Sequence, residues 1–455
     1  MKRTHLTQAL ALVAAVATTA TLTLAQSSTA GAAPAKIHSH PIKVHPQARQ
    51  VGTLPHAATF SCQTRPIDGS AGPRCYSPAQ IQKAYGVTPL LEAGNDGSGR
   101  TVVIIDAYQN PYIASDLATF DTTFDLPSPS FTNVVMPGTP KFDKKDANQV
   151  GWGEETTLDV EWAHAIAPGA RIVLVSAKSN QDIDILAATQ YAVDNDLGDV
   201  ISQSFGENDA CVDPQLFAQQ HQMFQQAVGQ GMTPIASSGD SGASQFNCDG
   251  TQATLAASSP ASDTFVTGVG GTTLSAADDG TYVGETAWTE TLFGCNPPAV
   301  AAGDVNCSGG GLSTVVAKPA YQKGFVQGSG RGVPDVAYNA GVNGGVLTVC
   351  SICNKGKPAV FLFGGTSAGT PQWAAITAIG DQIAGRRLGA LNPALYAVAG
   401  AAQRSGALHD VTTGNNDVVE LGGFGYSAGR GWDAVTGVGT PNAALLLPQL
   451  ISQTG

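Results

Sequence analysis

Apolar strands alternate with amphipathic helices along most of the chain, beginning near residue 76. Uninterrupted apolar strands that alternate with helices are typical of a mostly parallel sheet with both faces covered. The pattern therefore predicts an α/β fold with helices on both faces of a central sheet. The predicted strands span residues 100–108, 171–177, 199–206, 233–242, 264–271 and 359–365, and the predicted helices 77–87, 110–124, 153–170, 181–196, 213–231 and 367–385.

The N-terminus has a different pattern. Residues 1–33 combine a basic start, an apolar segment and small residues, which is typical of a secretory signal. Residues 34–75 form a Pro- and His-rich leader, and residues 76–455 form the body. No later apolar run reaches the ~20 residues that a membrane span needs. We therefore expect a secreted, extracellular monomer.

Charge narrows the class of partner. The chain has 23 Lys and Arg against 35 Asp and Glu, a net charge of −12, which disfavours nucleic acid. Charged residues make up only 13 % of the chain, against roughly 25 % in ordinary soluble domains. This low charge density limits self-repulsion at acidic pH. Protein or peptide substrates remain as the expected partners.

Eight cysteines in an exported chain indicate disulfides. Eight cysteines allow 105 connectivities, so the sequence leaves the pairing open. The CSIC string could also be a redox or zinc motif, but it has no second CxxC and no neighbouring histidine. Pairing between sequence neighbours would join Cys62 to Cys75, Cys211 to Cys248, Cys295 to Cys307 and Cys350 to Cys353.

Ser367 lies in FLFGGTSAGTPQW, after an apolar strand and at the start of a helix. The G-x-S-x-G string is that of an esterase nucleophile elbow, for which Asp381 and His409 would complete a triad, although Asp381 falls inside a predicted helix. A second serine, Ser241 in GDSG, has the nucleophile string of an all-β protease class, which the alternating pattern disfavours. The G-T-S-x-x-x-P string instead resembles subtilisin-like enzymes.

A subtilisin-like triad would need a histidine near Asp106, and the sequence offers none in a suitable context. His164 is nine residues from Glu155, on the opposite face of the predicted helix. Glu155 and Asp159 are four apart and share one helical face, so they could act as a base and its orienting partner. Taken alone, such a pair is more often a solvent-facing pair at a helix N-terminus.

Three motifs in order resemble the sedolisins, or serine-carboxyl peptidases, which have a subtilisin-like fold. They are ETTLDVEWAHAIAPGA, ASSGDSG and GGTSA, and the resemblance covers roughly residues 76–446. It implies Ser367 as the nucleophile, Glu155 as the general base, Asp159 as its orienting partner and a protonated Asp240 in the oxyanion hole. Asp106 matches a position that carries a further acid in some members.

The C-terminal segment is similar to the calcium loop of the same family. The resemblance implies one structural Ca²⁺, and Ca²⁺ accepts mixed shells of carboxylate, carbonyl and water oxygens. The implied ligands are the carboxylates of Asp410 and Asp433 and the backbone carbonyls of Val411, Gly429 and Gly431.

Two departures from the family pattern bear on function. Only about 40–50 residues separate the signal from the body, where members carry a long folded propeptide, and Phe205 stands where several members have Trp. The sequence therefore predicts an acid-acting secreted endopeptidase. The alternatives are a non-catalytic extracellular binding protein on a peptidase scaffold and a GxSxG esterase.

Overall fold

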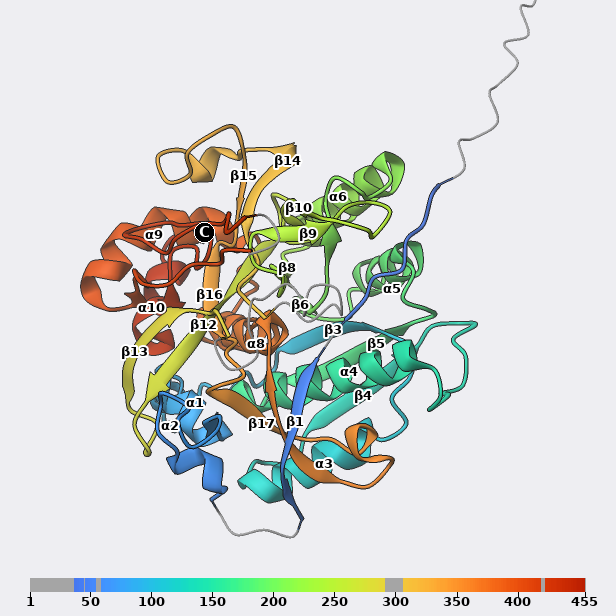
Figure 1. Cartoon of the computed structure of the whole chain (residues 1–455), viewed down its shortest axis with the longest axis vertical. Coiled ribbons are helices and arrows are strands. Elements are labelled where there is room, and N and C mark those ends of the chain that lie inside the picture. The colour runs from blue at the N-terminus through green and yellow to red at the C-terminus, as the bar shows by residue number, and fades with distance from the viewer. Residues whose placement is uncertain (1–36, 45, 55–58, 291–305, 419–421, 455) are drawn as a thin grey trace, which may run out of the picture. The chain divides into compact units, whose positions relative to one another are not determined.

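The largest sheet of the computed structural model has eight strands, all but one of them parallel (Figure 1). The structure describes residues 37–44, 46–54, 59–290, 306–418 and 422–454. The order across the sheet is β13 (Tyr282–Ala287), β12 (Thr267–Ala276), β8 (Thr233–Ser237), β6 (Val200–Gln203), β3 (Thr101–Ala107), β5 (Arg171–Ala177) and β4 (Ser130–Val135), and β16 (Val336–Asn339) also pairs with β12.

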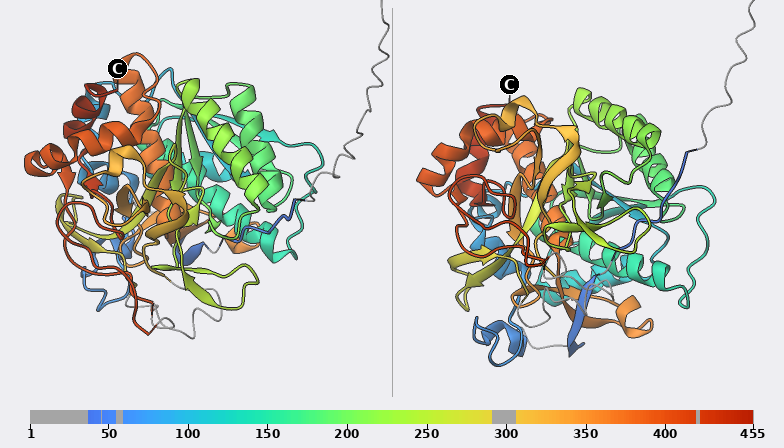
Figure 2. Two further views of the ribbon diagram at one scale, coloured as in Figure 1. Left: turned by 90° about the horizontal axis from the view of Figure 1, so that it is seen from above. Right: turned by 45° about the horizontal axis from the view of Figure 1, so that its top comes forward.

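Helices cover both faces of this sheet, as the alternating pattern predicts (Figure 2). On one face α4 (Ala147–Ile166) and α8 (Thr366–Ala384) pack against each other and the strands. On the other lie α5 (Asp182–Asp194) and α6 (Pro214–Gly229). Successive strand residues point to opposite faces, so Val102 and Ile104 join the first core and Val103 and Ile105 the second. The predicted α/β class is confirmed.

Helix α4 starts six residues earlier than the sequence pattern predicts. Its N-cap is Asp146, whose side chain accepts hydrogen bonds from the backbone N–H groups of Asn148 and Gln149. Such a cap satisfies donors that the first turn leaves unpaired. Glu155 and Asp159 therefore lie in the middle of the helix and are buried, rather than facing solvent at its N-terminus.

The strand before Ser367 does not belong to the parallel sheet, contrary to expectation. Strand β18 (Ala359–Gly364) pairs antiparallel with β17 (Gly345–Val349) in a separate sheet. Part of the leader, β1 (Gln47–Thr53), adds to the other edge of β18, and β2 (Cys75–Tyr76) pairs with β17. An apolar run does not predict which other strand it will pair with, because the backbone groups that form the hydrogen bonds are the same in almost every residue.

The remaining elements are short or peripheral. The other helices are α1 (Pro78–Ala84), α2 (Thr88–Glu92), α3 (Ile113–Phe124), α9 (Leu391–Ser405) and α10 (Ala443–Ile451). The other strands are β7 (Glu207–Asn208), β9 (Ser244–Phe246), β10 (Ala253–Leu255), β11 (Ser258–Ser259), β14 (Gly311–Ala317), β15 (Gly330–Val333), β19 (Leu408–His409) and β20 (Thr440–Pro441).

Three of the predicted disulfides are present: Cys62–Cys75, Cys211–Cys248 and Cys350–Cys353. The predicted partner of Cys307 is Cys295, which lies outside the described residues, as does the predicted signal segment, residues 1–33. None of the helices in the described ranges has the length and apolarity that crossing a membrane requires.

Candidate active site

Ser367 lies in the first turn of α8 and is partly exposed. The preceding Gly365 has a φ of 101°, in the region that favours glycine, and this lets the chain turn sharply from β18 into the helix. The first backbone N–H groups of a helix have no partner within the helix. The turn therefore presents a hydroxyl and backbone donors at the same point.

Asp240 follows β8 in the loop that contains the ASSGDSG string, and it contacts the turn before Ser367. Its Oδ1 accepts hydrogen bonds from the Thr366 backbone N–H at 2.8 Å and from the Thr366 hydroxyl at 2.6 Å. A Cβ atom at Gly365 would lie 2.7 Å from Asp240 Oδ2, too close for any other residue without movement. The glycine is therefore needed both for its backbone angle and for the approach of Asp240.

Helix α4 brings the carboxyl group of Glu155 to the Ser367 side chain. The Ser367 hydroxyl lies close enough to Glu155 to lower the pKa of that carboxyl, and it donates a hydrogen bond of 3.3 Å to the backbone carbonyl oxygen of Ser204. Asp159 follows one turn later on the same face, fully buried, with the Ser204 hydroxyl beside it. The structure thus brings Ser367, Glu155, Asp159 and Asp240 to one place, as the resemblance implies.

Asp106, at the end of β3, adds a third buried carboxyl group to Glu155 and Asp159. Burial raises the pKa of Asp106 to about 8. Burial, and then the charges of Asp106 and other nearby carboxyls, raises the pKa of Glu155 well above its usual range, which the nearby Ser367 hydroxyl partly offsets. The pKa of Asp159 is raised well above its usual value by burial, then by Asp106 and Glu155. Such a cluster holds protons in common and titrates as a set.

Glu154 is a fourth carboxyl that sequence reasoning placed away from the site. It lies about 140° around the helix from Asp159 at roughly 100° per residue, yet its charge still raises the pKa of Glu155. Its side chain is partly buried, and burial raises its own pKa to about 7. Helical spacing predicts the direction in which a side chain leaves the helix, but Coulomb interactions extend over several ångströms.

The two histidines considered as a base for Ser367, His164 and His221, form the contacts described here with other residues. His164 is buried, with Nε2 3.2 Å from Asp121 and 2.9 Å from the Pro127 carbonyl oxygen. His221 lies 2.8 Å from Asp263. These positions agree with the expectation that neither histidine serves as the base.

The triad of the esterase alternative is not assembled. His409 stacks on Tyr282 with ring centroids 4.0 Å apart. Asp381 lies within α8, where its Oδ1 accepts a hydrogen bond from the Leu388 N–H, and burial raises its pKa to about 8. Ser241, the other candidate nucleophile, forms a β-bridge with Cys307.

Ser204 and Thr366 are site residues that sequence reasoning missed. Ser204 contacts Ser367 twice, since its hydroxyl also donates to the Ser367 carbonyl oxygen at 3.4 Å. Its position directly after β6 is the signal that could have identified it, because ligands of parallel sheets bind at the C-terminal ends of the strands. Thr366 precedes the nucleophile and orients Asp240.

The predicted calcium ligands gather around one turn. Gly431 N–H donates to Asp410 Oδ1 at 3.1 Å, and Gly429 N–H donates to Asp433 Oδ2 at 3.0 Å. Two carboxyls that flank one glycine-containing turn fit a mixed oxygen site. Within the described ranges, no three or more His, Cys, Asp or Glu side chains lie together as a metal site. The predicted calcium site would use only two carboxylates, and backbone carbonyls would supply its other protein ligands.

Comparison with known proteins agrees with this geometry. The profile described as "Subtilase family" matches residues 145–418, more than half of the chain. Kumamolisin from Bacillus sp. (strain MN-32) is 33 % identical over 84 % of this chain and 65 % of its own length. Sedolisin from Pseudomonas sp. (strain 101) is 31 % identical over 89 % of this chain and 64 % of its own.

A solved structure supports the same assignment. Pseudomonas sedolisin, a serine-carboxyl proteinase complexed with two molecules of pseudo-iodotyrostatin, superposes with a TM-score of 0.71 and 26 % identity, covering 84 % of this chain and 100 % of that one. The chain therefore belongs to the subtilase family and, within it, to the sedolisins. It spans just under two thirds of the length of the kumamolisin and sedolisin sequences.

Proposed function

We propose that the protein is a secreted serine-carboxyl endopeptidase that hydrolyses peptide bonds at acidic pH through an acyl-enzyme on Ser367. One observation carries this proposal: the buried carboxyl of Glu155 lies beside the Ser367 hydroxyl, which lowers the pKa of that carboxyl. A carboxyl in the position of the base favours work in acid, because an ionised carboxylate persists where an imidazole is already protonated.

In the first step, Ser367 Oγ attacks the carbonyl carbon of the scissile bond and its proton passes to Glu155. Asp159 orients Glu155 and shares this proton within the buried cluster. Glu155 then gives the proton to the leaving amine as the C–N bond breaks, and an ester to Ser367 remains. Water attacks this ester in the second half, again with Glu155 as the base, and releases the acid product.

The oxyanion of each tetrahedral intermediate lies between the Ser367 backbone N–H and the carboxyl of Asp240. Asp240 must be protonated to donate a hydrogen bond. Thr366 donates two hydrogen bonds to Oδ1, so in the protonated form the proton would be on Oδ2. Loss of one oxyanion donor typically costs about 10²–10³ in kcat, so activity fades when Asp240 loses its proton.

The pH profile follows from these two requirements. Glu155 must be ionised to act as a base, while Asp240 must keep its proton. Because burial raises the pKa of Glu155, the acidic limb of the profile lies at higher pH than its usual pKa of 4.5 would give. We expect a bell-shaped profile with its maximum on the acidic side of neutrality.

Ca²⁺ has a structural part in this proposal. Asp410 and Asp433 would supply carboxylate oxygens, and Val411, Gly429 and Gly431 backbone carbonyls. The ion would neutralise two carboxylates around the C-terminal turn and stabilise it. The arrangement of both carboxyls around Gly429–Gly431 supports this assignment.

The test is hydrolysis of casein or a quenched peptide between pH 3 and 8 by the wild type and by Ser367→Ala. We expect cleavage of internal peptide bonds on the acidic side, abolished in the variant. A wild type that cleaves neither substrate, and whose Ser367 no aldehyde inhibitor labels, would support the non-catalytic alternative. Ester turnover near pH 7 that depends on His409 would support the esterase.

A further inference from the structure

Asn110, in the loop that follows β3, is hydrogen-bonded to the helix that carries Glu155. Its side chain is buried, and its Nδ2 donates to the Gly153 carbonyl oxygen at 2.9 Å and to the Thr157 hydroxyl oxygen at 2.8 Å. Its Oδ1 accepts a hydrogen bond of 2.9 Å from the Tyr112 N–H. A backbone carbonyl can only accept and a backbone N–H can only donate, so these partners fix which way round the amide lies.

The two contacts lie on the face of α4 opposite Glu155. Gly153 and Thr157 are four residues apart and therefore share one face of the helix. Glu155 lies two residues from each of them, about 200° around the axis at roughly 100° per residue. Asn110 therefore holds this turn of α4 on its far side, while the carboxyl of Glu155 lies beside Ser367.

Gly153 leaves the room that this contact needs. A Cβ atom at this position would collide with the side chain of Ile352, which lies between β17 and β18, and would lie 3.8 Å from the Cβ of Asn110. Ile352 is itself buried. The helix therefore approaches both side chains as closely as a glycine allows, and a larger residue would push α4 away from them.

The chain between Asp106 and Asn110 has a defined course. Asp106 lies beside the other carboxyls of the cluster, which α4 carries. Tyr108 has a φ of 65°, in the left-handed region that residues other than glycine rarely adopt. Two hydrogen bonds of 2.9 Å hold it there, from its N–H to the Ala177 carbonyl oxygen and from its hydroxyl to Asn180 Oδ1. A short, well-anchored loop thus joins the cluster to the contact on the far side of the helix.

We propose that Asn110 is a positioning residue: by holding α4 to the loop after β3, it sets the separation of the Asp106 carboxyl from those of Glu155 and Asp159. The inference rests on the proposed function, because this separation affects catalysis only if Glu155 acts as the base. Without the side chain of Asn110, this turn of α4 is free to move away from the loop. The carboxyls then separate and water reaches them.

The charges that act on Glu155 come from other carboxyls on three elements. They are Asp106 on β3, Glu154 and Asp159 on α4, and Asp240 after β8. A larger separation weakens the repulsion between like charges, because a Coulomb interaction falls with distance and with water between the groups. The pKa of Glu155, which burial and then these charges raise, should therefore fall when the side chain of Asn110 is removed.

The first experiment measures kcat and KM of Asn110→Ala across the pH range. We expect kcat to fall about 10- to 100-fold, as for a small misplacement of a catalytic group. KM should change less than about twofold, because Asn110 does not touch the substrate. The acidic limb of the profile should move to lower pH by about 0.5–1 unit, because Glu155 ionises more readily. A variant that is merely less stable would lose activity without this shift, and a limb that stays in place or moves to higher pH would overturn the proposal.

Two further variants show whether the contact with α4 is responsible. Gln109→Ala is the matched control, since the side-chain amide of Gln109 donates to the Pro140 carbonyl oxygen rather than to α4, and it should leave kcat and the acidic limb unchanged. Thr157→Val removes one of the two acceptors of Asn110 and should move the limb in the same direction by a smaller amount. The double variant Asn110→Ala, Thr157→Val should move it no farther than Asn110→Ala alone. Shifts that simply add would contradict the proposal.

A readout without catalysis separates this inference from the proposed function. Burial raises the pKa of Asp106 to about 8, so the free energy of unfolding falls as pH rises between its ordinary value and this one. In the inactive Ser367→Ala chain, adding Asn110→Ala should admit water, lower this pKa and flatten the fall, whereas adding Gln109→Ala should not. An unchanged slope with Asn110→Ala would refute the positioning of the cluster, even if the protein is a peptidase. A flattened slope in a protein whose wild type cleaves no peptide would support that positioning but refute its part in catalysis.

Discussion

Two groups of buried ionisable residues in this protein differ in their partners: one contains an ion pair and the other consists of carboxyls without a cation. Arg331 and Asp335 are fully buried and joined by two hydrogen bonds of 2.5 and 2.8 Å, and Asp335 also accepts from Gly268 N–H and the Tyr396 hydroxyl. Within the described chain, Asp106, Glu155 and Asp159 are equally buried but form no salt bridge with a lysine or arginine.

The two groups differ in whether a cation lies beside the buried carboxyls. Asp335 is joined to the guanidinium of Arg331 on β15 and to groups of its neighbours. A carboxyl that is buried without a cation keeps its proton far above its usual pKa and can exchange it with a neighbour. The protein thus buries an uncompensated carboxyl cluster beside Ser367, whereas its buried Asp335 has a guanidinium partner.

The largest expected effect is on catalysis. Glu155→Gln removes the proposed base, so kcat should fall about 10²–10⁴-fold, while the free energy of unfolding stays the same or rises because a buried ionisable group is lost. Steady-state kinetics and urea unfolding measure both. The matched control is Glu161→Gln on the same helix, which is also buried but accepts a hydrogen bond from Val349 N–H away from Ser367. Comparable losses of activity in both variants would refute the assignment of Glu155.

Breaking the Arg331–Asp335 ion pair should instead lower the free energy of unfolding. Arg331→Met leaves Asp335 buried without its cation and should destabilise the fold by about 3–5 kcal/mol. Chemical denaturation in the Ser367→Ala background measures this loss without self-digestion. Adding Asp335→Asn should recover much of the loss, because the amide oxygen can still accept from Gly268 N–H. A single variant as stable as wild type would mean that the ion pair contributes nothing.

Asp410 and Asp433 would form a third group of carboxylates, in which a bound Ca²⁺ ion balances the negative charge. Ca²⁺ at about 100 times its Kd should raise the free energy of unfolding by about 2.7 kcal/mol, and EDTA should remove that gain. Thermal unfolding with Ca²⁺, Mg²⁺ or EDTA measures the effect. Asp433→Asn should abolish it, whereas Asp417→Asn, elsewhere in the C-terminal segment, should not. No Ca²⁺-dependent shift in the wild type would exclude the site.

The smallest effect, taken per pH unit, is a slope of stability against pH. The pKa of Asp106 is about 8 in the folded chain against an ordinary 3.8, so between these values the unfolded chain releases a proton that the folded chain keeps. Stability therefore falls as pH rises through this window. Asp106→Asn should flatten the fall by up to about 1.4 kcal/mol per pH unit. Denaturation of Ser367→Ala chains at several pH values tests this, with exposed Glu92→Gln as control. An unchanged slope would show that Asp106 is ionised.

The sequence alone predicted most of the α/β pattern, because alternating apolar strands and amphipathic helices leave a periodic signal. It placed Glu155 and Asp159 on one helical face and Ser367 at a helix start for the same reason. It was wrong about the sheet that β18 joins and about the start of α4, since strand pairing and N-caps depend on partners outside the local pattern. It missed Ser204 altogether, because a single serine after a strand has no distinctive spacing.

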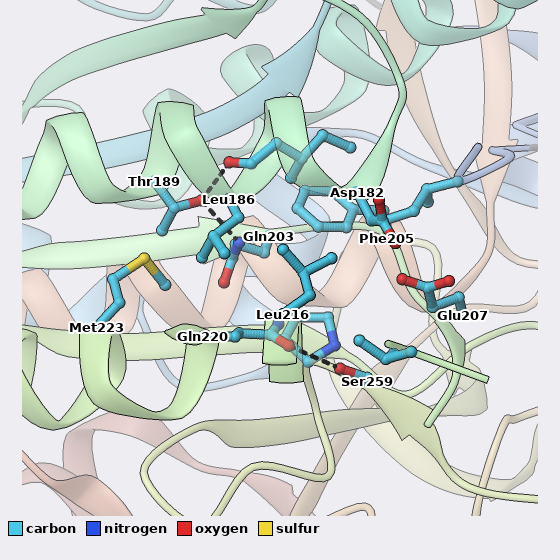
Figure 3. A pocket seen from close by; sticks show the side chains of 14 residues that line it. Asp182, Leu186, Thr189, Gln203, Phe205, Glu207, Leu216, Gln220, Met223 and Ser259 are labelled. Atoms are coloured by element: carbon cyan, nitrogen blue, oxygen red, sulfur yellow. Dashed lines mark hydrogen bonds between the residues drawn. The ribbon is translucent and has the colours of Figure 1, made fainter. Parts of the chain in front are cut away.

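Helical spacing and turn chemistry are local, so the amino-acid sequence by itself determined which carboxyls and which serine could act together, and the class of fold that holds them. Only the tertiary structure decided that Asp106 and Ser204 join them and that Asp240 meets Thr366 across 126 residues of chain. It also decided that Ile42 of the leader is buried against the pocket between α5 and α6 (Figure 3). The reason is that burial and Coulomb interactions act through space, and the pKa values that the chemistry requires exist only once the helices and strands have excluded water.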